Sequence, residues 1–427
     1  MKIQNKKVLV ITYSFPPKPN VASVRMRGLA KYLPQFGWDP TFLTIDLPGE
    51  PEAGFRVIQA SDPLDVMEQL KRGLGLNPKK GLQRQLGIAD QASNTKKPTI
   101  GKFTKRIEGW LSYPDKKRTW QPIALAALRN LLSREGFDAL LSTSPPVITN
   151  LIAREIHDEF GLPWVADFRD LWTGNHYYPY GPVRKLIDRR LEIKTIKQAS
   201  ALVTVSKPLS ESLEALHQRN AVFAIPNGFD PDTMKENDLH GRFSITYTGQ
   251  LYAGRRDPEL LLKVVRDLIR EQEINNDLQI NFYGPKVYWL DDLISEYGLE
   301  SLAFQWGIVN RAEAVRQQRS SQLLLSLNWD HPAEKGVYTG KIFEYLAAQR
   351  PILALGGPRG VVSDLLEETQ AGVHIRTEDE LREAILAWYS EYQENGFVSY
   401  QGNQQIYNYS HIKMAERFSE VLNEVCQ

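Results

Sequence analysis

The stretch Lys7-Val-Leu-Val-Ile-Thr-Tyr13 (KVLVITY) decides the fold class, because it is apolar and rich in β-branched residues without any polar alternation. Such a strand is typical of the centre of a parallel sheet that is covered on both faces. A proline-rich turn follows at 14–19, and a helical pattern follows at 22–36. This order of strand, turn and helix predicts a doubly wound α/β sheet.

The same order of elements recurs along the chain in two series. Further apolar runs that predict strands lie at 41–45, 139–142, 164–168, 201–205 and 222–225, and then at 243–248, 278–283, 323–327 and 351–355. Between the series lies 226–242, which is rich in Pro, Asn, Gly and Asp and is the best linker candidate. We therefore predict Rossmann-like domains at 1–228 and 229–400. A C-terminal helix within 401–427 is expected to cross back to the first domain.

Composition excludes several classes of protein. The 427 residues include 52 Lys plus Arg and 51 Asp plus Glu, and this balance argues against a nucleic-acid partner. The single cysteine, Cys426, excludes an internal disulfide and a Cys-based zinc site. No apolar run approaches the roughly 20 residues of a membrane span, and we see no signal peptide. We expect a cytoplasmic protein.

One segment, about 71–118, departs from the average charge. It holds 13 basic and three acidic residues, a local net charge of +10, with Phe103, Trp110 and Tyr113 among the charges. One interpretation is a solvated insertion in the first domain. The other is a patch that docks on an anionic membrane, which would place the protein peripherally on the inner face of the cell membrane.

In the second half, Gly336–Ala354 (GVYTGKIFEYLAAQRPILA) is the first candidate site. Free backbone N–H groups at a helix start near Gly340, with Lys341 beside them, suit a phosphate or diphosphate. Glu344 lies one turn further on, where paired ribose hydroxyls would be suitable donors to it. The alternative is an ordinary amphipathic helix with a solvated Glu344.

The second candidate, Tyr247–Asp257 (YTGQLYAGRRD), follows a predicted strand. Ligands of open α/β sheets bind beyond the carboxyl ends of the strands. Gly249 permits close backbone approach, and Arg255 and Arg256 offer guanidinium groups to a leaving diphosphate. The alternative is a surface turn with two solvated arginines.

In the first half, the turn Phe15–Asn20 follows the first strand but contains no dinucleotide-binding GxGxxG motif. Asp167, Arg169 and Asp170 lie at the end of another strand, before an aromatic loop of the kind that stacks on sugar rings. A structural Asp–Arg pair explains these charges equally well. We find no metal-binding motif; Asp-Pro-Asp at 230–232 is interpreted as a turn.

Together these clusters resemble family 4 of the retaining glycosyltransferases, which have the GT-B fold of two facing Rossmann-like domains. The resemblance runs over nearly the whole chain. Its landmarks are Val8–Pro17, Gly37-Trp38, Val205-Ser206, Ile225–Asp230, Tyr247–Gly249, Tyr283-Gly284 and Lys341–Ala354.

The resemblance implies a retaining transfer of a hexosyl group from a nucleotide diphosphate sugar, of UDP or GDP type, to an acceptor hydroxyl of a glycan or lipid-linked intermediate of polysaccharide biosynthesis. It implies no metal and no cofactor. The catalytic residues it implies are Arg256, Lys341 and Asp170. The donor-binding residues are Gly249, Gln250, Arg255, Gly284, Thr339, Gly340, Ile342 and Glu344. The acceptor-binding residues are Asn20, Asp167, Arg169, His176 and Tyr177.

The chain departs from the family pattern at several positions. Gly336 stands where the first glutamate of the family's Glu-x7-Glu motif is expected, Gln250 stands where an arginine is frequent, and Arg169 stands where a histidine often precedes the aspartate. Pro19-Asn20 replaces a glycine pair. Two other functions therefore stay open: a nucleotide-sugar epimerase of the same fold, and a noncatalytic nucleotide-sugar-binding partner in a polysaccharide assembly complex.

Overall fold

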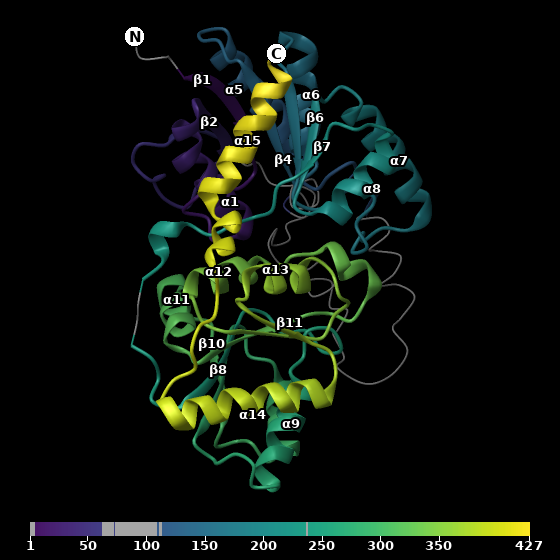
Figure 1. Cartoon of the computed structure of the whole chain (residues 1–427). Coiled ribbons are helices and arrows are strands. Elements are labelled where there is room, and N and C mark those ends of the chain that lie inside the picture. The colour runs from purple at the N-terminus through teal and green to yellow at the C-terminus, as the bar shows by residue number, and fades with distance from the viewer. Residues whose placement is uncertain (1–4, 62–71, 73–108, 111–112, 236–237) are drawn as a thin grey trace. The chain divides into compact units, whose positions relative to one another are not determined.

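The computed structural model describes residues 5–61, 72, 109–110, 113–235 and 238–427, which form two compact units (Figure 1). Unit 1 holds Met1–Ile225 and Ala415–Gln427, and unit 2 holds Pro226–Met414. The division thus falls at the start of the Pro- and Gly-containing linker, close to the sequence-based boundary at residue 228. The chain leaves unit 1 once and re-enters it near its C-terminus.

Unit 1 is built on a parallel sheet with the strand order β3-β2-β1-β4-β5-β6-β7. The strands are β1 (Lys6–Ile11), β2 (Trp38–Ile45), β3 (Arg56–Ala60), β4 (Ala139–Ser144), β5 (Trp164–Phe168), β6 (Ala201–Thr204) and β7 (Val222–Ala224). The helices between them are α1 (Val21–Tyr32), α5 (Gln121–Leu132), α6 (Ile148–Phe160), α7 (Pro182–Ile196) and α8 (Lys207–His217). Every residue of β4 and β5 is buried, which explains why both strands begin as apolar runs, Ala139–Leu141 and Trp164–Ala166.

Unit 2 has a second parallel sheet, with the order β10-β9-β8-β11-β12-β13. Its strands are β8 (Phe243–Thr248), β9 (Leu278–Tyr283), β10 (Ala303–Gly307), β11 (Leu323–Leu327), β12 (Ile352–Leu355) and β13 (Gly372–Ile375). Its helices are α9 (Glu259–Arg270), α10 (Tyr288–Glu296), α11 (Arg311–Ser320), α12 (Gly340–Ala348), α13 (Val361–Thr369) and α14 (Glu378–Asn395). Side chains of α9, α10 and α14 share one apolar core, and those of α12 and α13 share another on the opposite face of the sheet (Figure 1).

The strands predicted at the centres of both sheets are present. The sequence prediction missed β3, β10 and β13. Most of the basic segment 71–118 lies outside the described residues. Within the described ranges, no helix combines the length and apolarity needed to cross a bilayer.

The C-terminal helix α15 (His411–Val425) belongs to unit 1 from Ala415 onward. Phe418 is fully buried there, and the guanidinium of Arg25 lies 5.0 Å from the centre of its ring. The indole Nε1 of Trp38 donates to Asn423 Oδ1 at 3.2 Å. The last helix is therefore part of the packing of the first domain.

The two ends of unit 1 meet at Asp138. The carboxylate Oδ2 of Asp138 accepts from the backbone N–H of Lys7, at the start of β1, with an N–O distance of 2.7 Å. Its backbone carbonyl accepts from the Cys426 thiol at 3.4 Å. One loop residue thus contacts both the first strand and the last turn of the chain.

Candidate active site

The strand order of unit 2 reverses between β8 and β11, and open α/β sheets bind ligands outside the carboxyl ends at such a point. Tyr345 of α12 joins these two strand ends. Its buried hydroxyl accepts from the Thr248 N–H at 3.1 Å and donates to the Leu325 carbonyl at 3.1 Å. Burial raises the pKa of Tyr345 to about 12, so the phenol keeps its proton at neutral pH. The start of α12 is thereby fixed at the switch point.

Two glycines form the neighbouring loops. Gly249 follows β8 with a φ of +136°, and a Cβ there would lie 2.0 Å from Cε of Lys341. Gly284 follows β9 with a φ of +155°, and a Cβ there would lie 2.0 Å from the Gly249 carbonyl oxygen. Only glycine fits either position, because a side chain would displace the lysine or the adjoining loop.

Lys341 is the central cation of this edge. Its Nζ donates to the Tyr247 hydroxyl at 2.8 Å and lies 4.4 Å from the centre of the same ring. The pKa of Lys341 is lowered to about 7, mainly by burial and also by Arg256, while Glu344 opposes both effects. Lys341, Arg256 and Glu344 are therefore near enough to interact electrostatically, and an anion placed here would favour the charged lysine.

The start of α12 has unused hydrogen-bonding capacity. Thr339 occupies the N-cap position, but its side chain does not cap the helix. Within the described residues its Oγ1 is buried without a hydrogen-bond partner. Backbone N–H groups of a first helical turn also lack partners inside the helix and attract anions. The side chain of Ile342 is completely buried in the core, so only its backbone faces the helix start, and its donor-binding role stays a prediction.

Glu344 is half-buried and turned toward α11. Its Oε1 forms an ion pair with Arg311 Nη2 at 3.0 Å, and Gln318 Nε2 donates to its Oε2 at 3.5 Å. The carboxylate is thus held in place and is more than a solvated group on a helix. The sequence analysis missed Arg311 and Gln318, and no motif surrounds either of them.

The turn after β8 carries the two consecutive arginines, Arg255 and Arg256. A backbone bridge joins Tyr252 and Arg256. The Arg255 guanidinium is exposed and lies 4.4 Å from the centre of the Trp329 ring, in the loop after β11. Gln250 has an exposed side chain, and its backbone carbonyl accepts from the Tyr247 hydroxyl at 2.8 Å. Loops from both sides of the switch point therefore meet in this turn.

In unit 1, Asp167 has a structural role, and the acceptor contact assigned to it from sequence is wrong. Arg25 donates to both of its oxygens, from Nη2 at 2.9 Å and from Nε at 3.1 Å, and Thr143 Oγ1 donates at 2.9 Å. The side chains of Arg25 and Asp167 have no exposed surface. A fully buried, fully paired carboxylate has no atom to offer to an acceptor, so Asp167 ties α1 to β5.

The neighbouring charges lie at the carboxyl end of β5. Arg169 Nε donates to Thr143 Oγ1 at 3.0 Å, so Thr143 links Arg169 to the buried ion pair. Asp170 keeps exposed surface, but neighbouring groups partly desolvate its carboxyl and so raise its pKa, against the opposing effects of Arg169 and His176. Asp170 is thus the more accessible carboxylate of the two.

The other candidate acceptor residues lie on loops of unit 1. Asn20 is the N-cap of α1, and its Oδ1 accepts from the Ser23 N–H at 2.8 Å. His176 and Tyr177 have ring centres 4.1 Å apart, and the Tyr177 ring is 43% exposed. Their acceptor roles stay predictions.

Comparisons with known proteins bear on these residues. The family described as "Glycosyl transferase 4-like domain" matches residues 105–228. Residues 105–228 are thus similar to a glycosyl transferase 4-like domain. The domain includes β5 and the loop that carries Arg169, Asp170, His176 and Tyr177.

Solved structures agree with the whole fold. The Anabaena protein HepE, solved with UDP and glucose, matches with a TM-score of 0.61 at 12% identity over 98% of this chain and all of its own. Sucrose-phosphate synthase from Thermosynechococcus elongatus gives a TM-score of 0.62 at 13% identity over 99% of both chains. A Rickettsia africae glycosyltransferase gives 0.59 at 12% identity over 99% of both. No curated protein sequence matches the chain.

The GT-B fold class expected from the resemblance is confirmed by these matches and by the two doubly wound parallel sheets. Together with the glycosyl transferase 4-like domain, the fold supports a family 4 glycosyltransferase.

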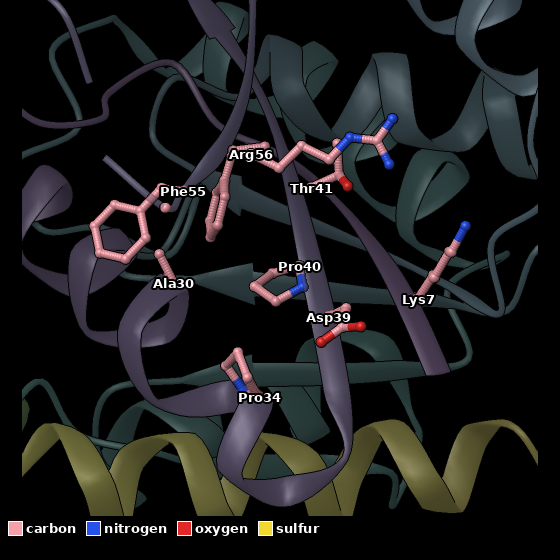
Figure 2. A pocket seen from close by; sticks show the side chains of 10 residues that line it. Lys7, Ala30, Pro34, Asp39, Pro40, Thr41, Phe55 and Arg56 are labelled. Atoms are coloured by element: carbon pink, nitrogen blue, oxygen red, sulfur yellow. The ribbon is translucent and has the colours of Figure 1, made fainter. Parts of the chain in front are cut away.

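A hollow of about 300 Å³ lies in unit 1. Figure 2 shows Ala30, Pro34 and Phe55 on one side of it and the charged ends of Lys7 and Arg56 on the other. Lys7 and Arg56 are near the beginnings of β1 and β3, so the hollow is at the amino edge of the sheet. We assign it no part in the candidate active site.

Proposed function

We propose that the protein is a retaining glycosyltransferase that moves a hexosyl group from a nucleotide diphosphate sugar to an acceptor hydroxyl. The observation that carries the proposal is the position of Lys341. This cation lies beside Arg256 and the open start of α12, at the switch point of the sheet. An anion binding there would gain charge, helix-dipole and N–H interactions together.

The proposed reaction uses these groups where charge develops. Transfer passes through an oxocarbenium-like state while negative charge builds on the departing diphosphate. Fixed cations around that diphosphate stabilise the transition state more than the ground state. We assign this role to Lys341 and Arg256, with Arg255 at the rim. No metal is required by this scheme, and the departing diphosphate takes the acceptor proton on the same face of the sugar.

Glu344 is proposed to accept from the paired ribose hydroxyls of the donor. Its carboxylate is ion-paired with Arg311, which favours one orientation. We propose UDP as the first nucleotide to test, because HepE was solved with UDP and with UDP-glucose. A glycan or lipid-linked acceptor of polysaccharide biosynthesis is proposed for unit 1, near Asp170 and Tyr177.

The test is hydrolysis and transfer with a panel of UDP- and GDP-hexoses, with and without EDTA. Glu344→Ala is expected to weaken donor binding, because it removes the ribose contact, and Arg256→Ala is expected to lower turnover. Glu296→Ala and Arg270→Ala are matched controls on the surface of unit 2. Wild-type rates in the Glu344 and Arg256 variants would refute these roles.

Product analysis separates the other two functions. An epimerase converts the donor in the absence of any acceptor and releases a new nucleotide sugar. A noncatalytic partner binds UDP but neither hydrolyses nor epimerises the donor, an outcome to consider because Gly336 replaces a family glutamate. Either result would overturn the proposed transfer.

A further inference from the structure

Helix α7 in unit 1 is inverted relative to an ordinary surface helix. Over most of its length the buried side chains are ionisable, namely Arg184, Asp188 and Glu192, at 4%, 1% and 0% exposure, and only its last turn buries Thr195 and Ile196. Large aliphatic side chains face outward, with Val183 65%, Leu186 53% and Ile193 40% exposed. A surface helix normally buries its aliphatic stripe and exposes its charges. The outer face of α7 therefore needs an explanation beyond stability.

Polar contacts hold the helix in this orientation. Arg184 Nε donates to Asp188 at 2.8 Å and its Nη2 donates to the Pro114 carbonyl at 3.1 Å. The Arg184 guanidinium also lies 4.6 Å from the ring centres of Tyr113 and Tyr180. Rotating α7 to bury its aliphatic residues would break this network and leave charges unpaired, which is strongly unfavourable.

The outward side chains follow helical spacing. Residues 183, 186, 190 and 193 lie on one side of a helix, because residues three or four apart are neighbours there. Cations accompany the aliphatic side chains on the exposed surface of α7, and they are Lys185, Arg189, Arg190 and Lys194. Both acidic residues of α7 point inward. The outer face of α7, defined as Val183, Leu186, Arg190, Ile193 and Lys194, thus combines aliphatic groups with positive charge alone.

This combination fits the surface of an anionic bilayer. Aliphatic groups enter the boundary between headgroups and acyl chains, while long cationic side chains extend to the phosphates. Trp110 is 48% exposed and its ring lies 5.9 Å from Arg184, so an amphipathic aromatic group accompanies this end of the helix. Tryptophan is favoured at such boundaries.

We propose that the outer face of α7 docks this protein on the surface of an anionic phospholipid membrane. The described residues of α7 carry the inference, and of the basic segment 71–118 only Trp110, Tyr113 and Pro114 enter it. Docking is independent of the donor residues, all of which lie in unit 2. A failure of the proposed transfer would leave it standing, because binding to vesicles is measured without any sugar.

Flotation of the full-length chain tests the proposal, with vesicles of phosphatidylcholine alone and of phosphatidylcholine mixed with phosphatidylglycerol. Binding is expected only to the mixed vesicles. Arg190→Gln and Lys194→Gln are each expected to lower the partition coefficient about fivefold, which corresponds to about 1 kcal/mol per basic residue. Leu186→Gln is expected to lower it about tenfold or more, because an aliphatic side chain no longer leaves water.

Matched controls come from exposed residues elsewhere in unit 1. Phe160→Gln, at the end of α6, and Arg134→Gln, after α5, are expected to bind like the unmodified protein. All variants should keep its melting temperature, since the substituted side chains are exposed. A solvent-sensitive fluorophore on Leu186→Cys, in a Cys426→Ser background, should shift to the blue with anionic vesicles, whereas one on Phe160→Cys should not.

Three results would overturn the proposal. Equal binding to neutral vesicles would remove the role of charge. Binding that survives Leu186→Gln combined with Lys194→Gln would place the contact outside α7. A dimer that forms without vesicle binding, and that Leu186→Gln dissociates, would assign the face to a second copy of the chain.

Discussion

The affinity for UDP is expected to fall as the pH rises through neutrality, because Lys341 loses its proton. The pKa of Lys341 is about 7 in the empty protein, and a bound diphosphate would favour the charged form and raise it. Binding therefore takes up a proton above neutral pH. The dissociation constant should then rise about tenfold between about pH 6 and about pH 8, through this one group.

Calorimetry in buffers of different ionisation enthalpy measures both the affinity and the proton uptake. Lys341→Met is the reference, because it keeps the length of the side chain without the titrating group. UDP itself gains charge near pH 6, which acts in the opposite direction, and the variant reports that effect alone. An identical pH profile in the wild-type protein and in Lys341→Met would refute the assignment of Lys341.

The same pKa shift affects stability with a defined sign. The folded pKa of about 7 lies below the ordinary value of 10.5, so the unfolded chain holds more protons between these values. The free energy of unfolding should therefore rise with pH across this window. Urea denaturation at several pH values should show a smaller rise for Lys341→Met than for the wild-type protein.

Three substitutions test the contacts of Tyr345 and Gly249 in unit 2 and the buried ion pair of Arg25 with Asp167 in unit 1. Tyr345→Phe removes the hydroxyl that bridges two buried backbone groups and should cost about 1–3 kcal/mol in the free energy of unfolding, measured with urea. Arg25→Met leaves Asp167 buried without its partner and should cost about 3–5 kcal/mol, measured as a lower melting temperature and urea midpoint. Gly249→Ala should abolish UDP binding by displacing Lys341, measured by calorimetry on folded protein.

Two control substitutions separate the proposed effects from a general loss of stability. Gly254→Ala shares the left-handed backbone problem, with a φ of +67°, but a Cβ there meets nothing within 4 Å. It should cost stability without changing UDP affinity, and an equal loss of binding in both glycine variants would contradict the steric argument. Arg154→Met is the control for Arg25→Met, because its ion pair with Asp158 is partly exposed.

The central strands were predictable because they are buried on both faces and are therefore continuous apolar runs. The strands that the sequence analysis missed, β3, β10 and β13, all lie at sheet edges. Only one residue in each is buried. An edge strand stays in contact with solvent, so most of its residues can be polar and it does not form a continuous apolar run in the sequence.

The site was predictable where local backbone chemistry dictates the residue. Gly249 and Gly284 have positive φ values, and Lys341 follows a helix start. Arg311 and Gln318, which contact Glu344, were not predictable, because they lie in a different part of the chain and no motif surrounds them. Arg311 reaches Glu344 only because α11 packs on α12.

The acceptor contact predicted for Asp167 was wrong for a different reason. A carboxylate beside an arginine at a strand end is consistent with both a ligand contact and a structural ion pair, and the sequence favours neither. The structural role follows from the partner, Arg25, which lies 142 residues away in the chain. Burial of the pair could be established only once the fold was known.

The meeting of Lys7 and Cys426 at Asp138 has a practical consequence for dissecting this protein. A fragment that stops at Ile225 lacks α15, whose Phe418 is buried in the packing of unit 1. The apolar surface that α15 covers would then be exposed, so we expect the fragment to aggregate. A short glycine–serine bridge replacing Pro226–Met414 should instead yield an autonomous N-terminal lobe. Because head and tail lie near one another, a circular permutant that fuses them and opens in a surface turn should also fold.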